Sequence, residues 1–147
     1  MLLERITLSD ISFVFDCLVA LREEALYDEC EFKRYLEINS LFNPGPFSIL
    51  VAREAGEQVG MLTCNRFSIP RYLGFGIEIE EVVVHPRYQG KGVAGRMMNE
   101  MIAMLSLDAS VRKVVVKTDD VQRAGKVYAK LFSISDQIIY AKAINRL

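Results

Sequence analysis

Residues 78–96 contain two groups of residues that could do chemistry, namely three carboxylates and a cluster of glycines with cations. In the cluster, Gly90 and Gly92 let the backbone come close to a ligand and adopt dihedral angles that are closed to other residues. The helical pattern that begins here leaves its first amides without internal partners, at the positive end of the helix dipole. Three cations lie in the same stretch, Arg87, Lys91 and Arg96. Together these features predict an anion site suited to a pyrophosphate or several phosphates.

The glycines also match one known phosphate-loop pattern and fail another. Residues 90–95 fit the dinucleotide fingerprint G-x-G-x-x-G, and Asp119 and Asp120 follow the next expected strand, where a ribose-binding acid would lie. However, the segment HPRYQ separates the glycines from the preceding strand, and the roughly 50 residues that follow are too few for the long sheet that this fingerprint opens. The Walker pattern is absent because neither Ser nor Thr follows Lys91.

The carboxylates lie on the strand expected at 77–85, just before the glycine cluster. In a regular strand, Glu78 and Glu80 face one side and Glu81 faces the other. A glutamate whose pKa is raised by its neighbours could take a proton from an amine, and three acids would attract a cationic substrate. Glu80 is the first candidate for this base and Glu81 the second, because a bulge could reverse which of them faces a cleft. A solvated strand face would show the same pattern.

The periodicity of the chain predicts the elements that must position these residues. Helices are expected after a cap at Ser9 or Asp10 and at 24–42, 92–106 and 121–132. Strands are expected at 4–8, 47–53, 59–68, 77–85, 111–118 and 136–145, with the second and third forming an antiparallel hairpin. This order describes a mixed α/β domain with a parallel crossover near the end.

Composition limits the classes of protein that fit. The 147 residues suit a single domain over 1–147, and 51% hydrophobic with 25% charged residues is typical of a soluble globular protein. The 18 basic and 19 acidic residues nearly cancel, which disfavours a nucleic-acid partner. No apolar run approaches the roughly 20 residues that span a membrane, and the N-terminus does not resemble a signal peptide. Three widely spaced cysteines fit reduced thiols in a cytoplasm better than a disulfide framework or a metal site.

The stretch VVVHPRYQGKGVAG resembles the acetyl-CoA signature of the GNAT superfamily of N-acetyltransferases. That signature is Gln or Arg, two residues, Gly, one residue, then Gly or Ala, and Gln89, Gly92 and Ala94 hold these places. The expected order of elements, β-α-α-β-β-β-α-β-α-β, is similar to the GNAT fold across essentially the whole chain. The resemblance implies three layers, in which helices flank a central mixed, mostly antiparallel sheet.

The resemblance also implies which residues would bind acetyl-CoA. In the family, the pyrophosphate lies on the amides of the loop and helix start, and the pantetheine arm pairs with the end of the preceding strand, beside a gap in the sheet. The matching residues are Val82, Val83, Val84, Gln89, Gly90, Lys91, Gly92, Val93, Ala94 and Gly95.

The segment RAGKVYAKLF resembles a later helix of the family, and Tyr128 matches the tyrosine that commonly protonates the departing thiolate of coenzyme A. Two positions depart from the family. Its frequent Asn is Val121 here, and its usual Gly-Phe after the helix is Phe132-Ser133. The first departure removes a polar contact that often helps to hold the cofactor.

These features favour a cytoplasmic N-acetyltransferase that moves the acetyl group of acetyl-CoA to a primary amine by direct attack in a ternary complex. Its candidate catalytic residues are Tyr128, Glu80 and Glu81. Cys64 shows no sign of an activating base, and His85, beside a proline, suits a cap or surface position. The alternative is a catalytically inactive GNAT-like acetyl-CoA sensor that acts through a protein partner. An NAD-dependent oxidoreductase rests on the glycine match alone.

The acceptor amine is left open between a small molecule and a peptide. No metal, nucleic-acid or membrane partner is expected, and edge strands at the chain's end are compatible with a homodimer.

Overall fold

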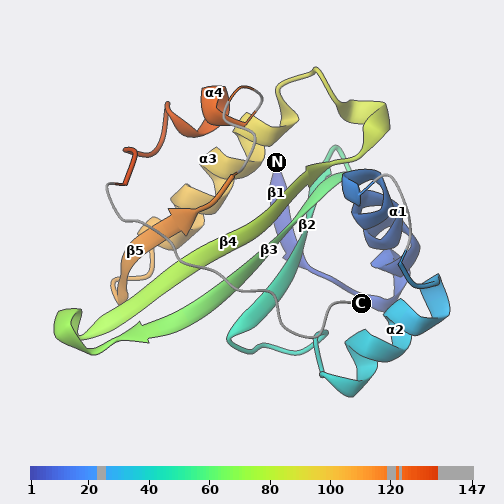
Figure 1. Ribbon diagram of the computed structural model, residues 1–147, viewed down its shortest axis with the longest axis horizontal. Helices are drawn as coiled ribbons and strands as arrows, with labels where there is room; N and C mark the ends of the chain where they lie inside the picture. The colour runs from blue at the N-terminus through green and yellow to red at the C-terminus, as the bar shows by residue number, and fades with distance from the viewer. Residues whose placement is uncertain (23–25, 119–121, 123, 136–147) are drawn as a thin grey trace. The chain divides into compact units, whose positions relative to one another are not determined.

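The computed structural model describes residues 1–22, 26–118, 122 and 124–135 (Figure 1). They belong to two units, the first over 1–117 and the second from Thr118 onward. The first unit contains β1 (Leu2–Arg5), α1 (Ile11–Arg22), α2 (Glu29–Ile38), β2 (Phe47–Glu54), β3 (Glu57–Ile69), β4 (Gly74–Val84), α3 (Val93–Ser106) and β5 (Val111–Val116). The second contains α4 (Gly125–Tyr128). A single domain over 1–147 stays a prediction.

The five strands form one sheet in the order β1-β2-β3-β4-β5, so that neighbours in the chain are also neighbours in the sheet. The first four strands pair antiparallel. β4 and β5 pair parallel, because α3 carries the chain back between them. The prediction of a mixed, mostly antiparallel sheet with a late parallel crossover is therefore confirmed.

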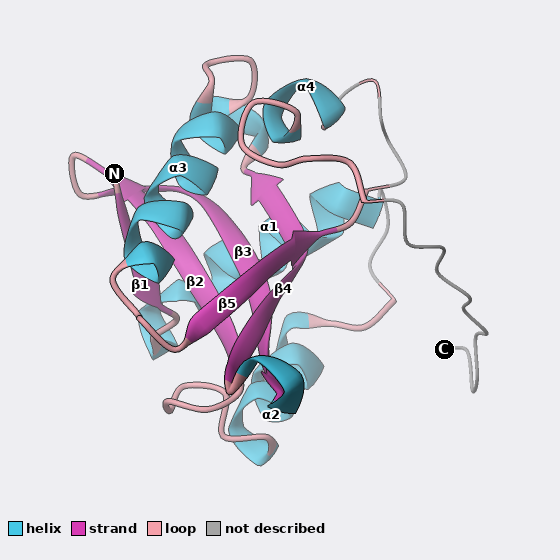
Figure 2. Cartoon of the chain, turned by 90° about the vertical axis from the view of Figure 1, so that its left-hand side faces the viewer, coloured by secondary structure: helices cyan, strands magenta, loops and turns pink. Residues whose placement is uncertain are grey.

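Helices cover both faces of the sheet, which gives three layers (Figures 1 and 2). On one face, buried side chains of α1 and α2 pack with Ile49, Val51, Met61 and Val83 of the strands. On the other face, a Cβ added at Gly60 would lie 2.8 Å from the sulfur of Met97 in α3, so this helix packs directly on Gly60. Because Gly60 and Met61 are consecutive and point to opposite faces, α3 lies across the sheet from α1 and α2. The predicted helix-flanked arrangement is confirmed.

Several boundaries differ from the prediction. β1 covers Leu2–Arg5 rather than 4–8, and β4 begins at Gly74 rather than at 77. α2 begins at Glu29 rather than at 24 because Asp28 caps it. The Asp28 carboxylate accepts from Glu31 N at 2.8 Å, and the Glu31 carboxylate accepts from Asp28 N at 2.9 Å, which is a reciprocal capping box. In the second unit, α4 is shorter than the helix expected at 121–132, and the strand expected at 136–145 lies outside the described residues.

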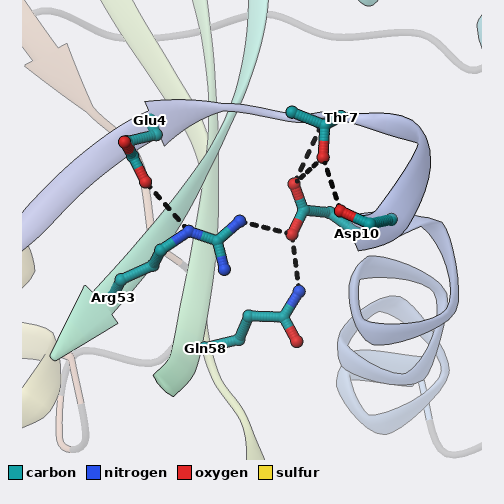
Figure 3. Close-up of polar contacts among 6 residues, drawn as sticks. Glu4, Thr7, Asp10, Arg53 and Gln58 are labelled. Atoms are coloured by element: carbon teal, nitrogen blue, oxygen red, sulfur yellow. Dashed lines mark hydrogen bonds and ion pairs between the residues drawn. The ribbon is translucent and has the colours of Figure 1, made fainter. Parts of the chain in front are cut away.

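The segment that precedes α1 differs from the prediction in its capping residue. Thr7, not Ser9 or Asp10, is the cap, and a 3-10 turn (Leu8–Asp10) leads into the helix. Asp10 is fully buried. One of its oxygens accepts from Thr7 N at 2.9 Å and Thr7 Oγ1 at 2.7 Å, and the other accepts from Arg53 Nη2 at 2.6 Å and Gln58 Nε2 at 2.5 Å (Figure 3). This buried carboxylate therefore ties the start of α1 to the end of the β2–β3 hairpin.

Replacing Asp10 by Asn is expected to lower the free energy of unfolding by about 2 kcal/mol, because it leaves Arg53 facing a neutral amide in a buried network. Burial raises the pKa of Asp10, but the hydrogen bonds from Thr7, Arg53 and Gln58 together hold it below its usual 3.8. A carboxyl with a lowered folded pKa stabilises the protein above the unfolded value, and this stabilisation is lost as the pH falls through the folded value. Denaturant unfolding of the variant and the wild type at pH 7 measures the first effect. The loss of wild-type stability between pH 7 and pH 3 measures the second.

The matched control for this variant is Asp16→Asn, which changes an exposed carboxylate of α1. It should leave the unfolding midpoint at pH 7 nearly unchanged. Equal midpoints for the Asp10 variant and the wild type at pH 7 would show that the network adds no net stability.

Candidate active site

A bulge in β4 decides which of the three acids share a face. In the register with β3, Cys64 pairs with Ile79 and Thr63 pairs with Glu81, so Glu80 is an extra residue on the bulged strand. Thr63 and Cys64 are consecutive and point to opposite faces, and their partners Glu81 and Ile79 therefore also point to opposite faces.

The bulge places Glu81, rather than Glu80, on the same face as Glu78. Glu78 pairs with Asn65, which is on the same side of β3 as Thr63 and Met61. Met61 packs with α1 and α2, so Glu78 and Glu81 both face the α1 and α2 side of the sheet. Glu80 is exposed. The regular alternation expected for this strand is thus interrupted at Glu80.

The Glu81 side chain is held in place by Thr63, a residue that sequence reasoning missed. Thr63 is 3% exposed, and its hydroxyl donates to Glu81 Oε2. The backbone N–H of Glu81 donates in turn to Thr63 Oγ1 at 3.2 Å. Glu81 is half-buried, so its carboxylate has a fixed orientation. Only the position of the bulge could have predicted this pair, since without it Thr63 would lie opposite another residue.

Glu78 is paired with a second residue that sequence reasoning missed. Lys117 directly follows β5, and its ammonium forms an ion pair with Glu78 Oε1. The Lys117 side chain is 44% exposed and that of Glu78 is 23% exposed, so the pair is partly exposed to solvent. Because Lys117 neutralises Glu78, Glu81 is the more available carboxylate on this face.

The pairing of β4 with β5 ends before β4 does. The last parallel pair is Ile79 with Val116, whereas β4 continues to Val84. On the other edge, β3 remains paired as far as Val84. Among the described strands, none pairs with the β5-side edge of residues 80–84. The backbone groups of Val82 to Val84 are therefore placed to pair with an added extended chain, as the resemblance implies for pantetheine.

His85 shapes the turn that follows β4. Its Nδ1 accepts from Arg87 N at 3.3 Å, its ring stacks on Phe13 with centroids 5.3 Å apart, and its backbone N–H donates to Val59 O at 3.0 Å. The side chain is buried. The predicted capping role is confirmed, whereas the surface position is not, because Phe13 covers the ring.

The glycine loop has the backbone conformation that its sequence predicts. Gly90 has φ 74° and Gly92 has φ 71°, both in the left-handed region. Gly92 is the N-cap of α3, and the bond from Arg96 N to Gly92 O at 3.3 Å begins the internal ladder of the helix. The N–H groups of Val93, Ala94 and Gly95 precede this bond, so they lie where a helix offers its amides to an anion.

The three cationic residues in and beside the loop, Arg87, Lys91 and Arg96, make different hydrogen bonds. Arg96 Nε and Nη2 donate to the two oxygens of Glu54 at 2.6 and 2.9 Å, and Arg96 Nη1 donates to Lys91 O at 2.8 Å. Lys91 Nζ donates to Arg87 O at 3.2 Å, and Arg87 is exposed. Arg96 is thus engaged with Glu54 and with the loop itself, and the prediction that its charge contributes to an anion site stays a prediction.

Tyr128, the predicted acid, ends α4 in the second unit. Its backbone N–H donates to Ala124 O at 3.1 Å, and its ring meets Phe132 edge-on with centroids 6.2 Å apart. Burial raises the pKa of the Tyr128 phenol, so the group keeps its proton at neutral pH. Its role as the acid stays a prediction. Val121, Asp119 and Asp120 lie outside the described residues.

Other chemistry has little support in the described part of the chain. There, no group of three or more His, Cys, Asp or Glu side chains could hold a metal ion. Burial raises the pKa of the Cys64 thiol, which makes it a poor nucleophile. None of the helices described is long and apolar enough to cross a membrane.

Similar solved structures share the fold at low sequence identity. A ribosomal-protein-alanine N-acetyltransferase from Brucella melitensis biovar Abortus 2308 has 21% identity and a TM-score of 0.77, over 98% of this chain and 100% of that chain. A Trypanosoma brucei acetyltransferase has 20% identity and a TM-score of 0.72, over 97% and 99%. An aminoglycoside acetyltransferase from an uncultured soil metagenomic sample, solved with sisomicin, has 16% identity and a TM-score of 0.72, over 99% and 96%.

A comparison with curated proteins finds no match for this sequence. The sequence model described as the Acetyltransferase (GNAT) family matches residues 13–133, which include β4, the glycine loop and Tyr128. The chain therefore belongs to the GNAT family of acetyltransferases.

Proposed function

We propose that this acetyltransferase uses acetyl-CoA to acetylate a primary amine of a small molecule or peptide, by direct attack in a ternary complex. The proposal depends on one observation about β4. The end of this strand leads into the positive-φ glycine loop, and its β5-side edge has no partner among the described strands. On the same strand, Glu81 faces α1 and α2. A donor site and an acceptor site would thus share one strand.

The residues at this site fit acetyl-CoA. The amides of Val93 to Gly95 would bind the phosphates, and the edge of Val82 to Val84 would hold the extended pantetheine arm. Gly90 has open space around it, since a Cβ added there would meet nothing within 4 Å, so a phosphate can approach its backbone. Bound acetyl-CoA supplies an activated acetyl thioester.

Glu81 is the favoured base. A neutral amine is required for attack, and a half-buried carboxylate whose orientation is fixed by Thr63 can take the ammonium proton, directly or through water. Glu80 has no cross-strand partner and is exposed, so it is the weaker candidate. Tyr128, with its raised pKa, would donate a proton to the thiolate that leaves.

The test is an acetylation assay with a panel of amines, in which the release of the coenzyme A thiol measures the reaction. Two of the similar structures are named for ribosomal-protein alanine and for aminoglycosides, so the panel should include peptide N-termini and aminoglycosides. Glu81→Gln is expected to lower kcat by about 100-fold or more at pH 7, because a general base contributes roughly that factor. A larger loss in Glu80→Gln than in Glu81→Gln would reassign the base.

The control for this test is Glu57→Gln, which removes an exposed carboxylate at the start of β3. It should keep wild-type activity. Binding of acetyl-CoA by the wild type without acetylation of any amine would instead favour an inactive acetyl-CoA sensor that acts through a protein partner. Cytoplasmic location and a homodimer stay predictions.

A further inference from the structure

The ion pair between Glu54 and Arg96 joins the β2–β3 hairpin to the glycine loop. Glu54 is the last residue of β2, and its two oxygens accept from two nitrogens of the Arg96 guanidinium at 2.6 and 2.9 Å. This parallel two-bond geometry gives the guanidinium a defined plane. The third nitrogen of the same group donates to the carbonyl of Lys91 at 2.8 Å. Arg96 therefore bridges a strand end and a loop carbonyl.

The bridged carbonyl belongs to the peptide unit that leads into Gly92, the N-cap of α3. Lys91 lies between Gly90 and Gly92, both with positive φ, so the peptide unit between Lys91 and Gly92 can rotate more easily than an ordinary one. A trans peptide is planar, with its N–H directed opposite to its C=O. By holding the Lys91 carbonyl, Arg96 also fixes the direction of the Gly92 N–H.

On the hairpin side, the residues next to Glu54 connect it to the core. The tip is a two-residue turn in which Ala55 and Gly56 have φ 50° and 84°. Arg53, next to Glu54, is bonded to the buried Asp10. The position of Glu54 is thus tied to the core rather than to a mobile surface segment.

From these contacts we propose that Glu54 and Arg96 are positioning residues, which set the conformation of the glycine loop for binding the phosphates of coenzyme A. Glu54 aligns the guanidinium, and Arg96 fixes the Lys91–Gly92 peptide. The proposal rests on the proposed function, since it takes the loop to be the phosphate site. It predicts an effect on the affinity for coenzyme A and on KM for acetyl-CoA, with little change in kcat.

The decisive variant is Glu54→Gln, because two explanations of the Glu54–Arg96 pair predict opposite changes in the Kd for coenzyme A. If the acid were only a nearby negative charge, or if it competed with phosphate for Arg96, its removal would tighten the binding of coenzyme A. If it aligns Arg96, its removal should raise the Kd for coenzyme A about tenfold, the loss of roughly one charge-assisted hydrogen bond. Calorimetric titration with coenzyme A measures the Kd, and steady-state kinetics separate KM from kcat.

The matched control is Glu57→Gln, which pairs with Glu54 in the hairpin register and removes the same charge at the same end of the hairpin. It should leave the Kd unchanged or slightly lower. Arg96→Lys keeps the positive charge but cannot bridge two groups in the same way, so it should raise the Kd as Glu54→Gln does. Equal unfolding midpoints for both variants and the wild type would establish that the loss of affinity is not a loss of fold.

The outcomes separate this proposal from the proposed function. A folded wild type that does not bind coenzyme A would overturn the proposed function. A wild type that binds, together with a Glu54→Gln variant that binds equally well or more tightly, would overturn the positioning role alone. A fall in kcat at unchanged KM would also contradict it.

Discussion

Replacing Gly92 by Glu is expected to abolish measurable binding of coenzyme A, with a rise in Kd of at least about 100-fold. Two effects add. A residue with a side chain costs about 1–2 kcal/mol in the left-handed region, where Gly92 has φ 71°. The new carboxylate would also lie at the N-cap of α3, where it would interact with the positive end of the helix dipole in place of a phosphate and would repel the phosphate. Calorimetric titration with coenzyme A measures the loss.

The strain and the charge can be separated at Gly95, one turn into the same helix. A Cβ added at Gly95 meets nothing within 4 Å, and its φ is not positive, so Gly95→Glu adds the charge without the strain. It is expected to weaken binding as well, whereas Gly95→Ala, a favourable change inside a helix, should preserve the fold. Full affinity in both glutamate variants would place the phosphates elsewhere.

Replacing Tyr128 by Phe is expected to lower kcat by about 100-fold or more, with little change in KM for acetyl-CoA. The change removes one hydroxyl, so it removes a proton donor without removing the ring that packs on Phe132. The pKa of Tyr128 is raised above its usual 10 by burial, so the phenol stays protonated to higher pH than an exposed tyrosine. In the wild type, the alkaline fall of kcat should therefore lie above about pH 10, where the acid loses its proton.

The control for the Tyr128 variant is Tyr35→Phe, which changes an exposed tyrosine on α2. It should leave kcat and the pH profile as they are in the wild type. An unchanged kcat in Tyr128→Phe would mean that water or another group protonates the thiolate, and the tyrosine would then be a packing residue.

The features that sequence could predict are those determined by residues close together in the chain. The hairpin strands, the α3 helix and the glycine loop each follow from local periodicity or from glycine positions, and all are present within a few residues of their expected bounds. The positive φ of Gly90 and Gly92 likewise follows from the residue type in a tight turn before a helix. The family resemblance was carried by the same local stretch.

The contacts that sequence could not predict join residues that are far apart in the chain. Arg96 and Glu54 are 42 residues apart, and Glu81 and Thr63 are 18 apart, so no local pattern relates them. Their pairing depends on register, and one extra residue in β4 changes which acid faces Thr63. The expectation of a regular strand therefore placed Glu78 and Glu80 on one face, and nothing in the loop sequence indicated that Arg96 pairs with Glu54.

The bulge at Glu80 also divides β4 into two segments that can vary separately. Before it, the strand pairs with β5 and carries Glu78; after it, the strand has no described partner on that side and leads into the glycine loop. Because the change of face occurs at one residue, we expect substitutions in the first segment to leave the register of Val82 to Val84 against β3 intact. Acceptor preference could therefore change during evolution through residues 74–79 while the segment that leads to the phosphate loop keeps its geometry.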